Sequence, residues 1–142
     1  MPLSARPFLA EHFTVARQAV SGRNGIVASQ HHLASEIGVE VLEAGGNAVD
    51  AAVAAAMALC VVEPWMSGMG GGGFMLVGNA ETGQVDEVDF GMVAPNAVDN
   101  SHYAIVEGDS GHDALFSWPR VIDDRNQIGP YSVAVPGAVA GL

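Results

Sequence analysis

A pair of glycines, Gly45-Gly46, separates two helical patterns and is the feature that most restricts the fold of this chain. In the first pattern, residues 29–44, apolar side chains recur every four positions and so share one face of a helix. These side chains are Leu33, Ile37 and Val41. Ser29 is a suitable N-cap for this helix, and the glycines end it because glycine adopts the left-handed conformation of a helix C-cap.

The second helical pattern begins at Asn47 and ends before Glu63-Pro64, because a residue that precedes proline resists the helical conformation. Asp50 lies three residues after Asn47, which is the spacing of a capping box. The segment is apolar nearly all round, so we expect it to be buried on several sides. Its unbroken apolar run, Ala51–Val62, is shorter than the ~18 residues of a membrane span. The two helices together predict an αα-hairpin.

A glycine-rich loop, Ser67–Phe74, leads into two short patterns that are typical of strands. They are FMLVG, residues 74–78, and QVDEVDF, residues 84–90. A turn at Glu81-Thr82-Gly83 joins them, so we expect a β-hairpin. The apolar segment Gly25–Ser29 predicts a further short strand.

The remaining segments divide the chain into an extension and one domain. Residues 1–24 are polar and aperiodic, and we interpret them as an N-terminal extension of a domain at residues 25–142. Residues 96–130 have the composition of loops, and Tyr131–Val135 predicts a strand. Pro136-Gly137 then opens an apolar helix, with proline in its first turn, that the chain cuts short. We therefore expect a truncated chain that exposes apolar surface and aggregates when alone.

The charge of the chain excludes two classes of partner. The net charge is −11, and residues 26–119 contain no Lys or Arg at all. Binding to nucleic acid or to an anionic membrane surface needs cations, so neither partner is expected. The N-terminus lacks the apolar run of a secretory signal, which favours a cytoplasmic protein, or a periplasmic one if the start is missing. Cys60 is the one cysteine and is expected to be a buried thiol.

No motif in the chain completes an active site. Gly68, Gly70 and Gly73 fit a G-x-G-x-x-G spacing, but a dinucleotide site needs a strand before these glycines and a helix after them. The order here is reversed, and a close approach by another backbone or a ligand explains the glycines better. The string at 108–111, GDSG, is interpreted as a polar turn. Adjacent histidines such as His31 and His32 chelate one metal poorly, so no metal and no cofactor are expected.

Four strings resemble the gamma-glutamyltransferase family, in the same order along the chain. They are residues 25–64, SGMGGGGFMLV, VDFGMVAP and VAVPGAVAGL. The most specific pieces are EAGGNAVDAAVA and GGGGFML. The resemblance covers residues 25–142, loosely over residues 96–130.

This resemblance implies an α+β fold, namely part of the four-layer αββα sandwich of N-terminal-nucleophile hydrolases. It implies a precursor that cuts itself and a new N-terminal threonine that attacks γ-glutamyl amides such as glutathione, with transfer to water or an amino acid. That threonine would lie downstream, so no catalytic residue is expected in this chain, which would be inactive alone. The implied partners are the remainder of the large subunit, the small subunit and a small-molecule amide. The glycines of the structural loop are Gly70, Gly71, Gly72 and Gly73.

The chain departs from the family pattern at one position of the implied substrate site, Gly91-Met92. The resemblance implies that an arginine stands at the position of Gly91 and binds the α-carboxylate of the γ-glutamyl substrate. Glycine has no guanidinium group to bind that carboxylate with two hydrogen bonds. An acylase or amidohydrolase of non-glutamyl amides is therefore the alternative. Alternatives of another class are a non-catalytic module that binds a nucleotide or anion at Ser67–Gly73, and an interaction fragment.

Overall fold

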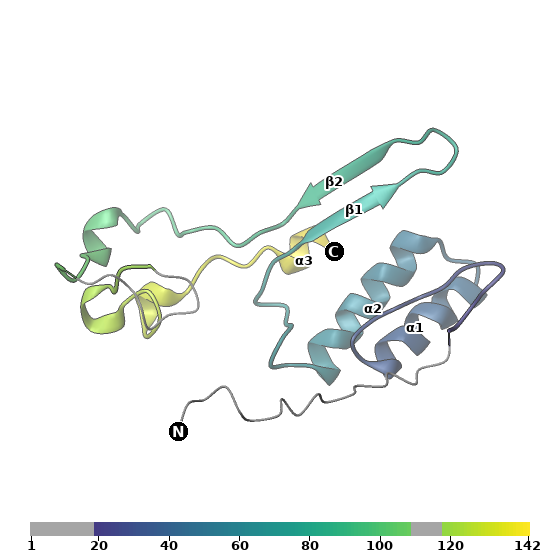
Figure 1. Ribbon diagram of the computed structural model, residues 1–142, viewed down its shortest axis with the longest axis horizontal. Coiled ribbons are helices and arrows are strands. Elements are labelled where there is room, and N and C mark those ends of the chain that lie inside the picture. The colour runs from purple at the N-terminus through teal and green to yellow at the C-terminus, as the bar shows by residue number, and fades with distance from the viewer. Residues whose placement is uncertain (1–18, 109–117) are drawn as a thin grey trace, which may run out of the picture.

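The computed structural model describes residues 19–108 and 118–142, which form a helix pair, a β-hairpin and a lobe of short turns (Figure 1). The helix pair and the hairpin lie side by side, and the lobe extends from the base of the hairpin. We call residues 92–108 and 118–135 the loop lobe. Within the described ranges, the architecture of helices with a two-stranded sheet agrees with the α+β class expected from the sequence.

The first helix, α1 (His32–Glu43), begins later than the sequence predicts. His31, not Ser29, is its N-cap, and the His31 ring accepts a hydrogen bond from the Leu33 N–H at 3.3 Å. The Ser29 hydroxyl instead donates to the His31 carbonyl and pairs with the Ser35 hydroxyl, both at 2.7 Å. The predicted Ser29 cap is wrong, because the N–H group at the start of the helix bonds to the His31 ring while the Ser29 hydroxyl bonds to His31 and Ser35.

The second helix, α2 (Ala48–Val62), starts with the capping box that the sequence predicts. The Asn47 side chain accepts from the Val49 and Asp50 N–H groups, and the Asp50 carboxylate accepts from the Asn47 N–H at 2.8 Å. These bonds satisfy donors that a helix N-terminus leaves without intrahelical partners.

Small residues form the contact between the helices. The buried positions are Ala34 and Gly38 of α1 and Ala51 and Ala55 of α2. Burial of α2 on several sides is not observed among the described residues: Met57 is 40% exposed and Val61 77%. The prediction fails because, among the described elements, α1 is the one that packs closely on α2, and it leaves Met57 and Val61 exposed.

The segment Gly25–Ser29 packs on α1 but is not a strand. An added Cβ at Gly25 would meet Leu42, and one at Gly38 would meet Val27 at 2.8 Å. In the part of the chain that the structure describes, no strand pairs with this segment, so it is not assigned to a sheet.

The β-hairpin agrees with the prediction. β1 (Phe74–Gly78) pairs antiparallel with β2 (Val85–Asp89), and Phe74 lies opposite Asp89 and Leu76 opposite Glu87. On the face that carries these pairs, Phe74 is 69% exposed and Leu76 70%. This face is mixed, because each of the two exposed apolar side chains lies opposite a carboxylate.

Three short 3-10 turns build much of the loop lobe, namely Asn100–Tyr103, Ile122–Asp124 and Pro130–Ser132. The predicted strand at Tyr131–Val135 is wrong, because its start belongs to the third turn and only Val135 forms a bridge, with Val93. The last helix, α3 (Ala138–Gly141), is present as expected, but Pro136 precedes its N-cap, Gly137, instead of lying in its first turn.

Among the described residues, no helix is long and apolar enough to cross a membrane. The GDSG string lies largely outside the described residues, as does most of the proposed N-terminal extension.

Candidate functional site

The glycine-rich loop is held against Phe90, the residue that follows β2. The two chains continue the hairpin pairing here, because the Phe90 N–H donates to the Gly73 carbonyl at 3.0 Å and the Gly73 N–H returns a bond of 3.3 Å. A Cβ at Gly72 would lie 2.6 Å from the Phe90 carbonyl oxygen, and a Cβ at Gly73 would lie 3.0 Å from the Phe90 ring. Only residues without side chains fit this close approach.

Two more glycines, the N-cap Gly137 and Gly141 at the end of α3, complete the packing around Phe90. A Cβ at Gly137 would lie 2.2 Å from the Phe90 carbonyl oxygen, and one at Gly141 would lie 2.1 Å from the Phe90 ring. The Gly71 carbonyl accepts the N–H groups of Gly137 and Ala138, each at 3.0 Å. The loop, the end of β2 and α3 therefore form one junction, which we call the glycine junction.

The sequence reasoning missed Gly137, Gly141 and Phe90 as parts of this junction. The available signal was the spacing of the two glycines, since residues four apart share one face of a helix. The structure separates the roles of the four loop glycines. Gly72 and Gly73 meet the backbone or ring of Phe90, whereas the space around Gly70 is open.

A cavity of about 400 Å³ opens beside the junction. Its walls come from α2, the segment that follows α2, the glycine loop and α3. They include Leu59, Cys60, Trp65, Gly72, Phe90 and Leu142. Cys60 is partly buried, and its thiol donates to the Ala56 carbonyl at 3.4 Å. The wall is therefore mostly apolar.

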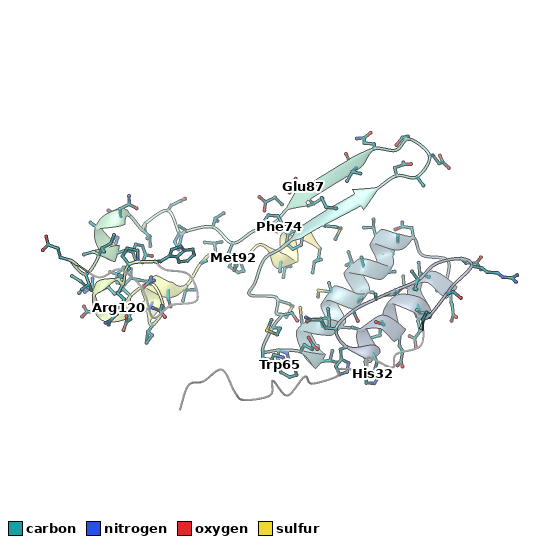
Figure 2. All side chains as sticks on the ribbon, viewed as in Figure 1. His32, Trp65, Phe74, Glu87, Met92 and Arg120 are labelled. Atoms are coloured by element: carbon teal, nitrogen blue, oxygen red, sulfur yellow. The ribbon has the colours of Figure 1, made fainter. Side chains whose placement is uncertain are left out.

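Gly91 and Met92 lie directly against the glycine loop. The Met92 nitrogen would be 2.9 Å from a Cβ at Gly72. The Asp89 carboxylate accepts the Gly91 N–H at 2.8 Å, which fixes the turn at which the chain leaves β2. Met92 is 56% exposed and lies where the hairpin meets the loop lobe (Figure 2). The structure thus brings together Gly91, Met92, Gly72 and Gly73.

The arginines that follow Gly91 in the described chain lie in the loop lobe. Arg120 forms an ion pair with Asp124 at 3.7 Å, and Arg125 pairs with Asp123 at 3.3 Å. The Arg125 guanidinium also lies 5.8 Å from the centre of the Tyr131 ring. Figure 2 shows Arg120 within the lobe and well away from Met92. Arg120 is therefore not placed to bind a carboxylate at Gly91.

The described residues contain no group of three or more His, Cys, Asp or Glu side chains that could hold a metal ion. The rings of His31 and His32 stack at 4.6 Å instead of converging on one point. One carboxyl group is perturbed: the Ser101 hydroxyl and N–H both donate to Asp99, which lowers the pKa of this carboxyl below its ordinary value. Its role is to cap the turn Asn100–Tyr103.

The geometry also disfavours a phosphate site in the glycine loop. The loop runs into β1, so no helix N-terminus follows it to bind an anion. The Gly71 N–H donates to the Gly68 carbonyl within the loop, and the Gly73 N–H donates to the Phe90 carbonyl, so neither donor is left for an anion. The loop organises the backbone at this junction.

Comparison with known proteins gives consistent matches over most of the chain. Residues 34–142 match the family model described as Gamma-glutamyltranspeptidase. The glutathione hydrolase proenzyme of Bacillus subtilis (strain 168) is 53% identical over 126 residues, which cover 89% of this chain and 20% of that protein. The acylase ACY 1 proenzyme of Pseudomonas sp. (strain SE83) is 38% identical over 129 residues, covering 91% of this chain and 22% of that protein.

The solved structures agree with these matches. The crystal structure of Helicobacter pylori gamma-glutamyltranspeptidase has a TM-score of 0.72 and 37% identity, and the match covers 87% of this chain and 32% of that one. The chain spans about a fifth of the length of the curated relatives that it matches.

Proposed function

This chain belongs to the gamma-glutamyltranspeptidase family, and we propose that the complete protein is a self-processing enzyme that cleaves γ-glutamyl amides such as glutathione. The observation that carries the proposal is the family match over residues 34–142, which confirms the resemblance seen in the sequence. Several relatives are named glutathione hydrolase proenzymes, which supports both the substrate class and the processing step.

The proposed reaction uses a threonine outside this chain. Its hydroxyl oxygen attacks the amide carbonyl while its own α-amine takes the hydroxyl proton. The carbon–nitrogen bond then breaks, and the amine leaves with that proton. Water or the amine of an amino acid attacks the resulting ester, which releases the acyl group and restores the hydroxyl. No cofactor enters these steps.

In this proposal residues 25–142 supply scaffold and substrate contacts. The helix pair lies beside the hairpin (Figure 1), and we infer that in the complete protein a second sheet covers the face on which Phe74 and Leu76 are exposed. Burial of such apolar surface stabilises the assembled sandwich by about 25 cal/mol for each Å² that is removed from water. The covering partners are the remainder of the large subunit and the small subunit of the same precursor.

The experiment is expression of the complete protein, followed by electrophoresis and an amide assay. We expect the precursor to split into two chains, and the processed protein to release p-nitroaniline from γ-glutamyl-p-nitroanilide. A matched threonine-to-alanine variant at the new N-terminus should do neither. A purified protein that stays intact and cleaves no amide would rule out the proposal.

A second candidate uses the same chemistry on a different acyl group. The observation that favours it is Gly91, which carries no side chain to bind a carboxylate, together with the pairing of Arg120 and Arg125 with carboxylates of the loop lobe. An unpaired carboxylate in a buried site is costly. The relative named acylase ACY 1 proenzyme, 38% identical, supports an amidohydrolase of non-glutamyl amides.

A further inference from the structure

Asn24 is the one asparagine of the chain that a glycine follows. The side chain of asparagine carries an amide carbon that a backbone nitrogen can attack, and asparagine is therefore among the thermolabile residues. The attacking nitrogen belongs to the next residue along the chain. A glycine in that place has no Cβ to hinder the approach, and its backbone reaches conformations that other residues avoid. The pair Asn24-Gly25 is thus the place where the sequence makes this reaction easiest.

The structure leaves both reacting groups of this pair accessible. Asn24 and Gly25 are exposed, and the chain bends at Arg23 and Asn24. Among the described residues, the Asn24 side-chain amide has no hydrogen-bond partner, and the Gly25 N–H donates to no acceptor. The reaction therefore does not first have to break a hydrogen bond that holds either group in place.

Two other exposed asparagines show how the surroundings of Asn24 differ. The Asn79 side-chain oxygen accepts the N–H groups of Glu81 and Thr82 at 2.9 and 3.2 Å, which holds its amide in the hairpin turn. Asn96 is exposed and makes no side-chain hydrogen bond within the described part of the chain, but an alanine follows it. Asn96 therefore matches Asn24 in exposure and in its unbonded amide, and differs in the residue that follows.

We propose that Asn24 is a site of spontaneous deamidation. The Gly25 nitrogen attacks the side-chain carbonyl carbon of Asn24 and loses its proton. The bond from that carbon to the amide nitrogen breaks, and ammonia leaves with the proton. A five-membered succinimide ring remains. Water then opens the ring at either carbonyl, which gives aspartate or isoaspartate, so water is the one co-reactant and no catalytic side chain takes part.

Both products change the chain directly before the segment that packs on α1. Each product adds one negative charge to a chain whose net charge is −11. Isoaspartate also lengthens the main chain by one carbon atom, because the backbone then runs through the side chain. The segment that follows is closely packed, since a Cβ at Gly25 would lie 3.0 Å from Leu42 and one at Gly38 would lie 2.8 Å from Val27. The modification therefore alters charge and chain length where the chain enters this contact.

The test follows two peptides of the complete protein during incubation in mildly alkaline buffer. Cleavage after glutamate releases residues 12–36, which contain Asn24, and residues 88–107, which contain Asn96. Fragment mass spectra assign each change to a single residue. We expect Asn24 to gain the mass of an NH-to-O exchange about tenfold faster than Asn96, because the residue after Asn24 has no side chain.

Two variants identify the cause of the difference. Gly25→Ala should slow the modification of Asn24 to the rate at Asn96, and its new methyl group meets the side chain of Leu42, which can rotate. Asn24→Gln should leave the peptide unchanged over the same period, because the longer side chain closes a ring more slowly.

Three results would overturn the inference. They are an Asn24 that stays unmodified in the parent protein, an Asn24 that changes no faster than Asn96, and a rate at Asn24 that Gly25→Ala does not alter. The comparison of the two asparagines within the parent protein needs no variant, so it holds even where a substitution disturbs folding. None of these results depends on amide hydrolysis, and the inference is therefore tested separately from the proposed function.

Discussion

Replacing Gly72 with alanine should loosen the glycine junction, because the new methyl group would occupy space that the main chain fills. The Cβ would lie 2.6 Å from the Phe90 oxygen and 2.9 Å from the Met92 nitrogen, well inside the 3.4 Å at which ordinary contact begins. Both neighbours are backbone atoms and cannot rotate away. Overpacking of this kind costs about 1–3 kcal/mol. The matched control is Gly70→Ala, which meets nothing within 4 Å and should be neutral or slightly stabilising.

Amide hydrogen exchange in the complete protein measures this loss where it occurs. The Phe90 N–H bonds to Gly73, and the Ala138 N–H bonds to Gly71. If Gly72→Ala weakens the junction by about 1–3 kcal/mol, both amides should exchange about 5- to 150-fold faster, since 1.4 kcal/mol is a factor of ten. Amides of α1 should be unaffected. Exchange as slow as in the parent protein, or equal acceleration by Gly70→Ala, would refute the reasoning.

Three further predictions concern the candidate site and the caps. Gly91→Arg should raise kcat/KM for γ-glutamyl-p-nitroanilide about tenfold, because the new guanidinium can bind the α-carboxylate of the substrate with two hydrogen bonds. An unchanged kcat/KM would argue against the assignment of position 91 to the substrate site. Asp50→Ala should destabilise α2 by about 1 kcal/mol, seen as faster amide exchange in its first turn; no change would contradict the importance of the capping box. Ser101→Ala should raise the pKa of Asp99 toward its ordinary value in an NMR titration. Because the pKa is lowered in the folded chain, the contribution of this cap is present above the unfolded pKa and is lost as pH falls through the folded one. A pKa that stays low in the variant would mean that Ser101 is not its cause.

Elements with local signals were predictable from the sequence. The capping box at Asn47 and Asp50 depends on residues three apart, and the hairpin depends on two strands and one turn. Both are set by neighbours in the chain, so the sequence alone specifies them. The Ser29 cap failed because histidine is not among the preferred N-cap residues, so no signal in the sequence indicated that His31 would cap the helix.

Features that depend on distant residues were not predictable in the same way. The packing of Gly137 and Gly141 on Phe90 joins positions far apart in the chain. The predicted strands at Gly25–Ser29 and Tyr131–Val135 have suitable compositions, but a strand exists only where a partner pairs with it. The bridge between Val93 and Val135 likewise joins two segments whose contact no local pattern indicates. The resemblance to a family identified the chemistry, which the residues present could not do alone.

The central claim is that this chain provides scaffold and substrate contacts while the nucleophile lies outside it. Acid quenching of the complete protein during turnover of γ-glutamyl-p-nitroanilide, followed by peptide mass mapping, tests it directly. The account predicts one acyl adduct, on the N-terminal threonine of the second chain, and unmodified peptides throughout residues 1–142. An adduct on any residue of these 142, such as Thr14, Thr82 or Cys60, would contradict it.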